Sequence, residues 1–88
     1  MINKIETKIK KSLDIHYIEI IDNSNAHKHH NKESKGGHYT AIIISDSFID
    51  KSLVERHQMV YTALGDMLQN EIHAFSMKTL TKIEFKNQ

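Results

Sequence analysis

The sequence of 88 residues contains no cysteine, no proline and no tryptophan. Without cysteine the chain forms no disulfide, has no thiolate nucleophile and offers no sulfur ligand of its own to a metal or a cluster. Long apolar runs are missing too, since the longest covers residues 41–44, against the roughly 20 residues that cross a bilayer. The first residues also lack the apolar block of a secretory signal. We therefore expect a soluble, cytoplasmic protein with no membrane segment.

A strong net charge is also absent, because 12 lysine and arginine residues face 11 acidic residues and leave a net charge of +1. This balance disfavours a strongly basic nucleic-acid binder, although a local basic patch is compatible with it. The length and the 39% hydrophobic content fit one small domain over residues 1–88, with a core over about 2–84. The unusual feature is seven histidines, because imidazoles bind transition metals and gain charge just below neutral pH.

The apolar pattern predicts the secondary structure. Isoleucine and leucine at helical spacing predict a first amphipathic helix over residues 3–13. Stretches rich in β-branched and aromatic residues predict strands at 17–22, 38–45 and 72–79, and the second should be the most buried. Residues 23–37 are polar, aperiodic and rich in histidine, which predicts a long loop. Loops of this length are uncommon in small domains and often carry function.

Capping signals indicate where the helices begin. Asn3 followed by Glu6 predicts an N-cap for the first helix. Ser52 and Glu55 have the spacing of a capping box in front of the main helix, which we expect over residues 53 to about 69. Gly65 is expected inside this helix.

The main helix carries an apolar stripe at steps of three and four residues: Leu53, His57, Val60, Tyr61, Leu64 and Leu68. The position of His57 in this stripe indicates a core histidine hydrogen-bonded to the backbone or to a helix end, rather than a metal ligand. Thr81 and Glu84 predict the cap of a final single helical turn.

The element order, α-β-β-α-β with a short C-terminal helical turn, predicts an α+β fold with a three-stranded mixed sheet. A strand-helix-strand unit normally makes a right-handed parallel crossover, so the second and third strands should start at the same end. This topology gathers His38 and His73 with the loop histidines His27, His29 and His30. We predict a histidine cluster there. For any single loop histidine a plain surface role is the simpler interpretation, because H-K-H-H lacks the spacing of a zinc site.

Catalytic motifs are not recognisable in this sequence. It has no G-x-S-x-G nucleophile elbow and no glycine-rich phosphate loop, and its carboxylates show no paired spacing. We therefore expect a protein that is not an enzyme.

Four short segments, in this order and spacing, resemble the BolA family over about residues 2–84. They are D-N-S-x-x-H at 22–27, H-Y to S-D-S-F at 38–48, E-R-H-Q-M-V-Y at 55–61 and I-H-A-F-S at 72–76. The resemblance implies a compact domain similar to class II KH domains. The sequence departs from the family at Asp50, where glycine is usual, and after Thr79, where a different ending predicts a short last helix.

The resemblance implies partnership with monothiol glutaredoxins of the CGFS type, with which a BolA protein shares a [2Fe–2S] cluster. The glutaredoxin cysteine and glutathione would supply the sulfur ligands, and two imidazoles would complete a Rieske-type ligand set. The family's ligand in the H-A-[LF]-[AS] segment corresponds to His73, and its loop ligand corresponds to His27. His29, His30 and His38 are alternatives to His27. The isolated chain, a monomer or weak homodimer, is expected to hold no cluster.

The alternative function is that of a KH-like DNA-binding transcriptional regulator, a role that some BolA proteins resemble. Weak phosphate contacts are then expected from Arg56, Lys78 and Lys82. The sequence lacks the G-x-x-G loop with which KH domains clamp nucleic acid, and the low net charge also favours the cluster role. An acid-responsive interaction module without a cofactor is the third alternative.

Overall fold

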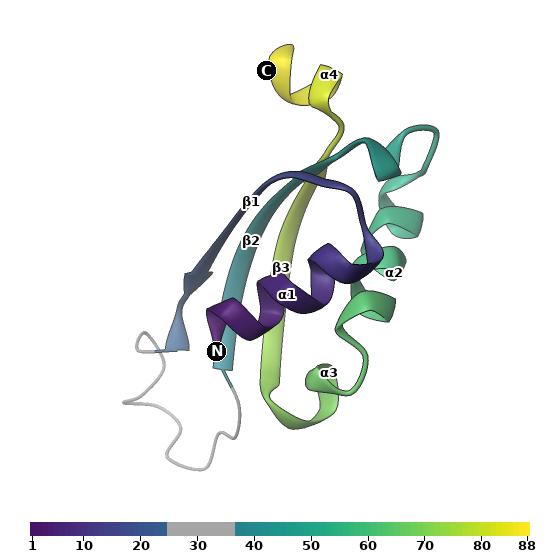
Figure 1. Ribbon diagram of the computed structural model, residues 1–88. Coiled ribbons are helices and arrows are strands. Elements are labelled where there is room, and N and C mark those ends of the chain that lie inside the picture. The colour runs from purple at the N-terminus through teal and green to yellow at the C-terminus, as the bar shows by residue number, and fades with distance from the viewer. Residues whose placement is uncertain (25–36) are drawn as a thin grey trace.

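The structure is a computed structural model that describes residues 1–24 and 37–88 (Figure 1). Its elements follow the predicted order. They are α1 (Ile2–Ser12), β1 (Ile15–Asp22), β2 (Gly37–Ser45), the 3₁₀ turn η2 (Asp46–Phe48), α2 (Leu53–Leu64), α3 (Met67–Asn70), β3 (Ile72–Leu80) and α4 (Lys82–Lys86). None of the helices in these two ranges is long and apolar enough to cross a membrane.

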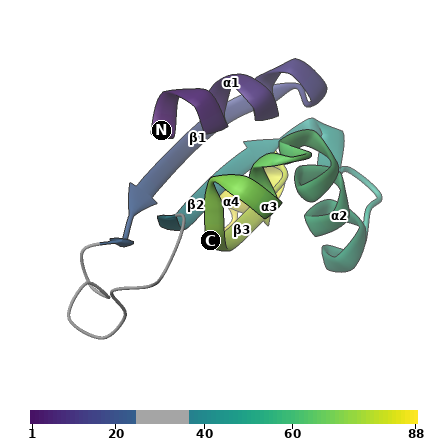
Figure 2. The same ribbon diagram turned by 90° about the horizontal axis from the view of Figure 1, so that it is seen from below.

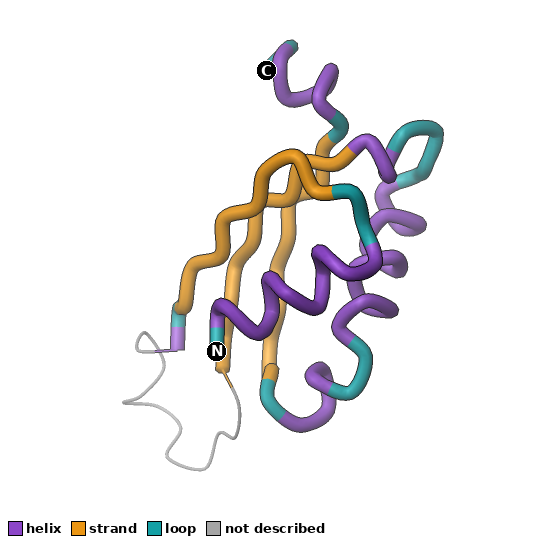
Figure 3. Tube along the Cα trace, viewed as in Figure 1, coloured by secondary structure: helices purple, strands orange, loops and turns teal. Residues whose placement is uncertain are grey.

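The three strands form one mixed sheet in the order β1-β2-β3 (Figure 3). β1 and β2 are antiparallel, whereas β2 and β3 are parallel, as the sequence predicts. The isoleucine-rich β2 is the central strand and the most buried one, which confirms the prediction for residues 38–45. Because β2 and β3 are parallel, both strands begin at the same end of the sheet.

Helices α1 and α2 pack on the same face of the sheet (Figure 2). Alternate residues of β2 point to this face and meet aliphatic side chains of the two helices. The buried members include Ile5, Ile9, Tyr39, Ala41, Ile43, Val60 and Leu64. Full burial stabilises the folded state by about 1.5–3 kcal/mol for each aliphatic side chain, so this face holds the fold together. Neither of these two helices covers the opposite face, which we call the outer face.

The first helix starts earlier than the capping pattern indicates. α1 begins at Ile2, and Met1 is its N-cap without a side-chain hydrogen bond. Asn3 therefore lies inside the helix, where its carbonyl oxygen accepts a hydrogen bond from the Thr7 hydroxyl at 2.8 Å. The predicted Asn3 cap is wrong because Ile2 packs against the core and draws residue 2 into the helix.

The main helix is shorter than predicted. Its capping box of Ser52 and Glu55 is confirmed, but α2 ends at Leu64 rather than near residue 69. Gly65 has φ 57° and ψ −129°, a conformation that glycine adopts readily and other residues rarely do. The chain then restarts as α3, which places Met67 in the core. The prediction of Gly65 inside a helix is therefore wrong.

The face of α2 that meets the core differs from the predicted stripe. Leu53 is 64% exposed and Tyr61 is 40% exposed, whereas Arg56 is only 7% exposed. His57 is partly buried, and its imidazole forms no hydrogen bond with the parts of the chain that the structure describes. The interpretation of His57 as a hydrogen-bonded core histidine is therefore wrong. The neighbouring Arg56 is the buried polar residue of this helix instead.

The turn between η2 and α2 explains the departure from the family at Asp50. Asp50 has φ 64°, in the left-handed region that glycine adopts without cost and aspartate tolerates better than most residues.

The last helix, α4, is short, as expected. Thr81 and Glu84 form the predicted capping box in front of it.

We expect Asp50→Gly to raise the free energy of unfolding by about 0.5–1 kcal/mol, because glycine removes the left-handed strain but adds entropy to the unfolded chain. Asp50→Ala should lower it by a similar amount. Urea unfolding of the three proteins measures both effects. An Asp50→Ala variant more stable than Asp50→Gly would contradict the role of backbone strain at this position.

Candidate functional site

The candidate site lies where β2 and β3 begin. Gly37 pairs with Ile72, but His38 pairs with Ala74, so the ladder skips His73. His73 is the extra residue of a β-bulge, an irregularity that redirects side chains and is frequent next to functional sites. His73 and Ala74 are consequently both exposed. They lie between Ile72, which is buried, and Phe75, which packs against the core.

The bulge brings His73 beside His38, as the predicted topology requires. The centroids of the two imidazole rings are 4.9 Å apart, and the ring planes are inclined by 49°. His73 is exposed and His38 is partly buried. Two imidazoles on one tetrahedral metal ion, with metal–nitrogen bonds of about 2.1 Å, have ring centroids about 5 Å apart. The His38–His73 pair therefore has the spacing of two ligands of one metal ion.

The other predicted ligands of the cluster, His27, His29 and His30, lie outside the described residues.

Hydrogen bonds at the end of β1 position the backbone of His38. The Asn23 amide donates to the His38 carbonyl oxygen at 2.7 Å, and the His38 amide donates to Ser24 Oγ at 3.0 Å. The Ser24 amide in turn donates to Asp22 Oδ1 at 2.8 Å. The side-chain and backbone hydrogen bonds of Ser24 lower the pKa of the Asp22 carboxyl. The D-N-S segment therefore fixes the start of β2.

Sequence reasoning missed this positioning role of Ser24 and Asn23. The available signal was the aspartate two residues before Ser24, because aspartate side chains commonly accept a hydrogen bond from the backbone two residues on.

The glycine immediately before His38 leaves room for the ring of Tyr39. A Cβ atom at Gly37 would overlap the ring of Tyr39, which lies across it on the core side. The Gly37 amide also donates to the Glu71 carbonyl oxygen at 3.0 Å, which ties the start of β2 to the residue before β3. These contacts hold the start of β2 beside the start of β3. The imidazoles of His38 and His73 are thereby held close to each other.

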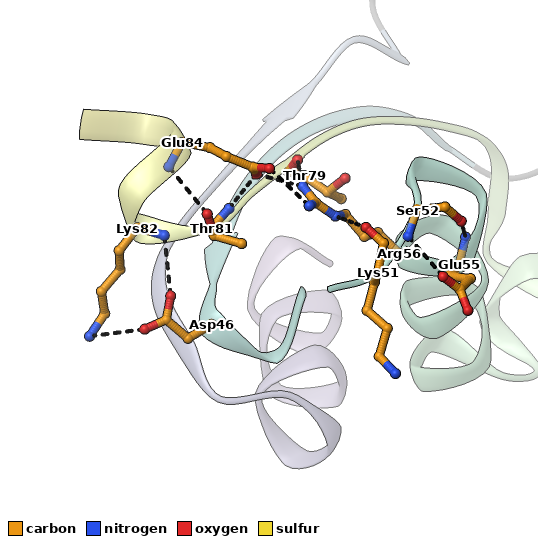
Figure 4. Close-up of polar contacts among 9 residues, drawn as sticks. All are labelled: Asp46, Lys51, Ser52, Glu55, Arg56, Thr79, Thr81, Lys82 and Glu84. Atoms are coloured by element: carbon orange, nitrogen blue, oxygen red, sulfur yellow. Dashed lines mark hydrogen bonds and ion pairs between the residues drawn. The ribbon is translucent and has the colours of Figure 1, made fainter. Parts of the chain in front are cut away.

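Arg56, one of the three predicted phosphate contacts, is held inside the fold (Figure 4). Its guanidinium donates to both Glu84 carboxylate oxygens, at 2.6 and 2.9 Å, and to the carbonyl oxygens of Lys51 and Thr79, at 3.0 and 3.1 Å. These contacts use four of its five N–H groups. Arg56 therefore joins α2, β3 and α4, and its N–H groups are directed inward.

The two predicted lysine contacts are exposed. Lys78 lies on β3, opposite Ile42 of β2. The Lys82 amide donates to Asp46 Oδ1 at 3.3 Å, and its ammonium is 3.8 Å from Asp46 Oδ2. Such an exposed pair is weak, so the Lys82 side chain can still exchange partners.

Comparison with known proteins gives consistent results. A family model described as BolA-like protein matches residues 9–84. A Haemophilus influenzae protein named DNA-binding transcriptional regulator BolA is 34% identical over 96% of this chain and 80% of its own length. SufE-like protein 1, chloroplastic/mitochondrial, from Arabidopsis thaliana is 37% identical over 92% of this chain, which spans 24% of that longer protein. The structure of BolA1 from Arabidopsis thaliana matches with a TM-score of 0.80 and 29% identity, covering 93% of this chain and 92% of that one.

The Arg56–Glu84 pair should make the fold sensitive to acid. Hydrogen bonds from Arg56 lower the pKa of Glu84 from 4.5 to about 2. Because this folded-state pKa is depressed, the pair stabilises the protein above pH 4.5, and the stabilisation is lost as the pH falls toward 2. We expect Glu84→Gln to lower the melting temperature at neutral pH. On acidification, the melting temperature of this variant should fall by less than that of the parent.

The measurement is thermal unfolding followed by circular dichroism between neutral pH and the pKa of Glu84. Glu6→Gln is the matched control, because Glu6 belongs to an exposed ion pair, 3.6 Å from Lys10. If the parent and Glu84→Gln lose the same stability in acid, the structural role of the pair is refuted.

Proposed function

The chain belongs to the BolA-like family, and on that premise we propose that it pairs with a monothiol glutaredoxin of the CGFS type. In this proposal the two proteins bind a shared [2Fe–2S] cluster and act in iron–sulfur cluster trafficking or in iron and stress regulation. The observation that carries the proposal is the His38–His73 pair, with ring centroids 4.9 Å apart at the common start of two strands.

The proposed ligand set follows from the side chains that this sequence offers. The chain has no cysteine, so the sulfur ligands come from the glutaredoxin cysteine and from glutathione. His73 is the first imidazole ligand. The second is His38, which its spacing from His73 supports, or His27, which the family resemblance supports, with His29 and His30 as neighbours able to replace His27. Two thiolates and two imidazoles form the ligand set of a Rieske-type cluster.

Cluster binding is expected to depend on the partner. Residues 1–24 and 37–88 contain no group of three histidine or acidic residues placed to hold a metal ion. Two imidazoles alone leave half of the ligand positions of a [2Fe–2S] cluster open. We therefore expect the isolated chain to stay colourless after iron–sulfur reconstitution, and the mixture with glutaredoxin and glutathione to absorb visible light.

His73→Ala should abolish the Rieske-like visible and circular dichroism spectrum of the reconstituted heterodimer, because it removes the first imidazole ligand. The apo fold should be unchanged, since His73 is exposed and is the residue that the β-ladder skips. His16→Ala is the matched control. His16 is an exposed histidine at the irregularity of β1, between Ile15 and Tyr17, at the opposite end of the sheet.

Separate substitutions distinguish the candidates for the second ligand. The heterodimer spectrum should change with His38→Ala if His38 is the ligand, and with His27→Ala if the loop supplies it. A cluster spectrum unchanged by His73→Ala, or a stable cluster on the isolated chain, would refute the proposed function.

Nucleic-acid binding is a second candidate, favoured by the name of the Haemophilus influenzae relative and by the exposure of Lys78 and Lys82. We propose only a weak, sequence-independent association. Arg56 contributes little to it, because its guanidinium is occupied by Glu84 and by two carbonyl oxygens. The low net charge also limits the number of simultaneous phosphate contacts.

We expect the logarithm of the DNA affinity to fall by only a few units per unit of log salt concentration, and Lys78→Gln to reduce this slope by about 1. Fluorescence anisotropy of a labelled duplex at several salt concentrations measures the slope. Lys4→Gln is the control, because Lys4 lies on α1, on the other face of the sheet from Lys78. Tight binding to one defined DNA sequence at physiological salt would reverse the order of the two candidates.

A further inference from the structure

A hollow of about 280 Å³ opens on the outer face of the sheet, at the end where α4 lies. It lies between β1, β2 and α4. Its lining residues are His16, Tyr17, Glu19, Ile42, Ile44 and Phe85. Along β2, Ile44 lies six positions after His38, which corresponds to about 20 Å at about 3.3 Å per residue. The hollow is therefore distinct from the histidine pair.

The size and lining of the hollow select its occupant. Small-molecule sites usually measure about 300–1,000 Å³, so this hollow suits one or two side chains. Its floor is apolar, since Ile44 is 1% exposed and Ile42 is partly buried. Its aromatic sides, Tyr17 and Phe85, are 48% and 52% exposed. A large aliphatic side chain would cover apolar surface that water now contacts.

One charged group at the hollow forms no ion pair with the part of the chain that the structure describes. Glu19 accepts a hydrogen bond from the Tyr17 hydroxyl at 3.3 Å. In the described ranges, Glu19 takes part in no ion pair. The chemistry that complements this hollow is therefore an aliphatic side chain with a lysine or arginine close beside it.

The chain itself presents this combination on α4. The capping box and the Arg56–Glu84 ion pair fix α4 through its polar residues. Ile83 is consequently 71% exposed, the highest value among the exposed large hydrophobic residues. Lys86 follows Ile83 by three residues, so both project from one side of the helix. Lys86, too, belongs to none of the ion pairs found in the described ranges.

We propose that a second copy of this chain occupies the hollow. Ile83 of the second copy packs on Ile42 and Ile44, and its Lys86 approaches Glu19. Each copy carries both the hollow and the Ile83–Lys86 side of α4, so a two-fold arrangement fills both hollows at once. The contact is small, and the dimer is therefore weak and concentration-dependent. The histidine pair at the other end of the sheet is left accessible.

Sedimentation equilibrium of the full chain, from about 10 µM to about 1 mM, tests the proposal. The dimer fraction should rise with concentration, and Ile83→Ser should weaken association by about tenfold or more, because it removes the aliphatic side chain that fills the hollow. Leu53→Ser is the matched control, since Leu53 is 64% exposed on α2, away from the hollow. It should leave the dissociation constant unchanged.

Charge reversal tests the pairing of the two copies. Glu19→Lys and Lys86→Glu should each weaken the dimer, and the double variant should restore it. A chain that stays monomeric at about 1 mM would overturn the proposal. Three other results would also overturn it: a dimer that Ile83→Ser does not weaken, a dimer that Leu53→Ser weakens equally, or a double variant that does not dimerise as the parent does. All of these side chains are exposed, so circular dichroism should show an unchanged fold in every variant.

Discussion

The parallel pairing of β2 with β3 is the constraint on which the rest of this structure depends. A parallel pair needs a crossover, so η2, α2 and α3 must lead the chain from one end of the sheet back to the other. The crossover puts α2 on the face that α1 also covers, which leaves the outer face without either helix. It also makes both strands begin together. The proximity of His38 and His73 therefore follows from topology, before any contact between their side chains is considered.

This topology could be predicted from the sequence because it rests on periodicity and on the handedness of crossovers, which are general. The bulge at His73 was not predicted, although a signal for it was present. Ile72 and Phe75 both belong to the core side, and a spacing of three residues cannot keep two side chains on one face of a regular strand. The ladder resolves the conflict by skipping one residue, and that residue is the exposed histidine. The predicted gathering of His27 with His73 stays a prediction, because His27 lies outside the described residues.

The role of Arg56 illustrates why other parts of the site could not be read from the sequence. Charged side chains mostly face solvent, and the sequence predicts Arg56, with Lys78 and Lys82, as a phosphate contact. Its burial depends on a carboxylate 28 residues later in the chain. Glu84 was recognisable only as the acidic residue of a capping box, yet its Oε1 accepts from both the Thr81 amide and Arg56. Such a shared acceptor is a tertiary feature that a local motif does not contain.

The bulge also leaves the side chain of His73 independent of the strand pairing that holds the sheet together. In a regular strand each residue contributes to the ladder, so a change of side chain is constrained by the strand's pairing as well as by its chemistry. His73 stands outside that pairing, while Ile72 and Ala74 on either side keep the register. A substitution of His73 therefore changes an exposed side chain without altering the pairing of β3 with β2. In this respect the position tolerates a change of chemistry that the paired positions of the strand do not.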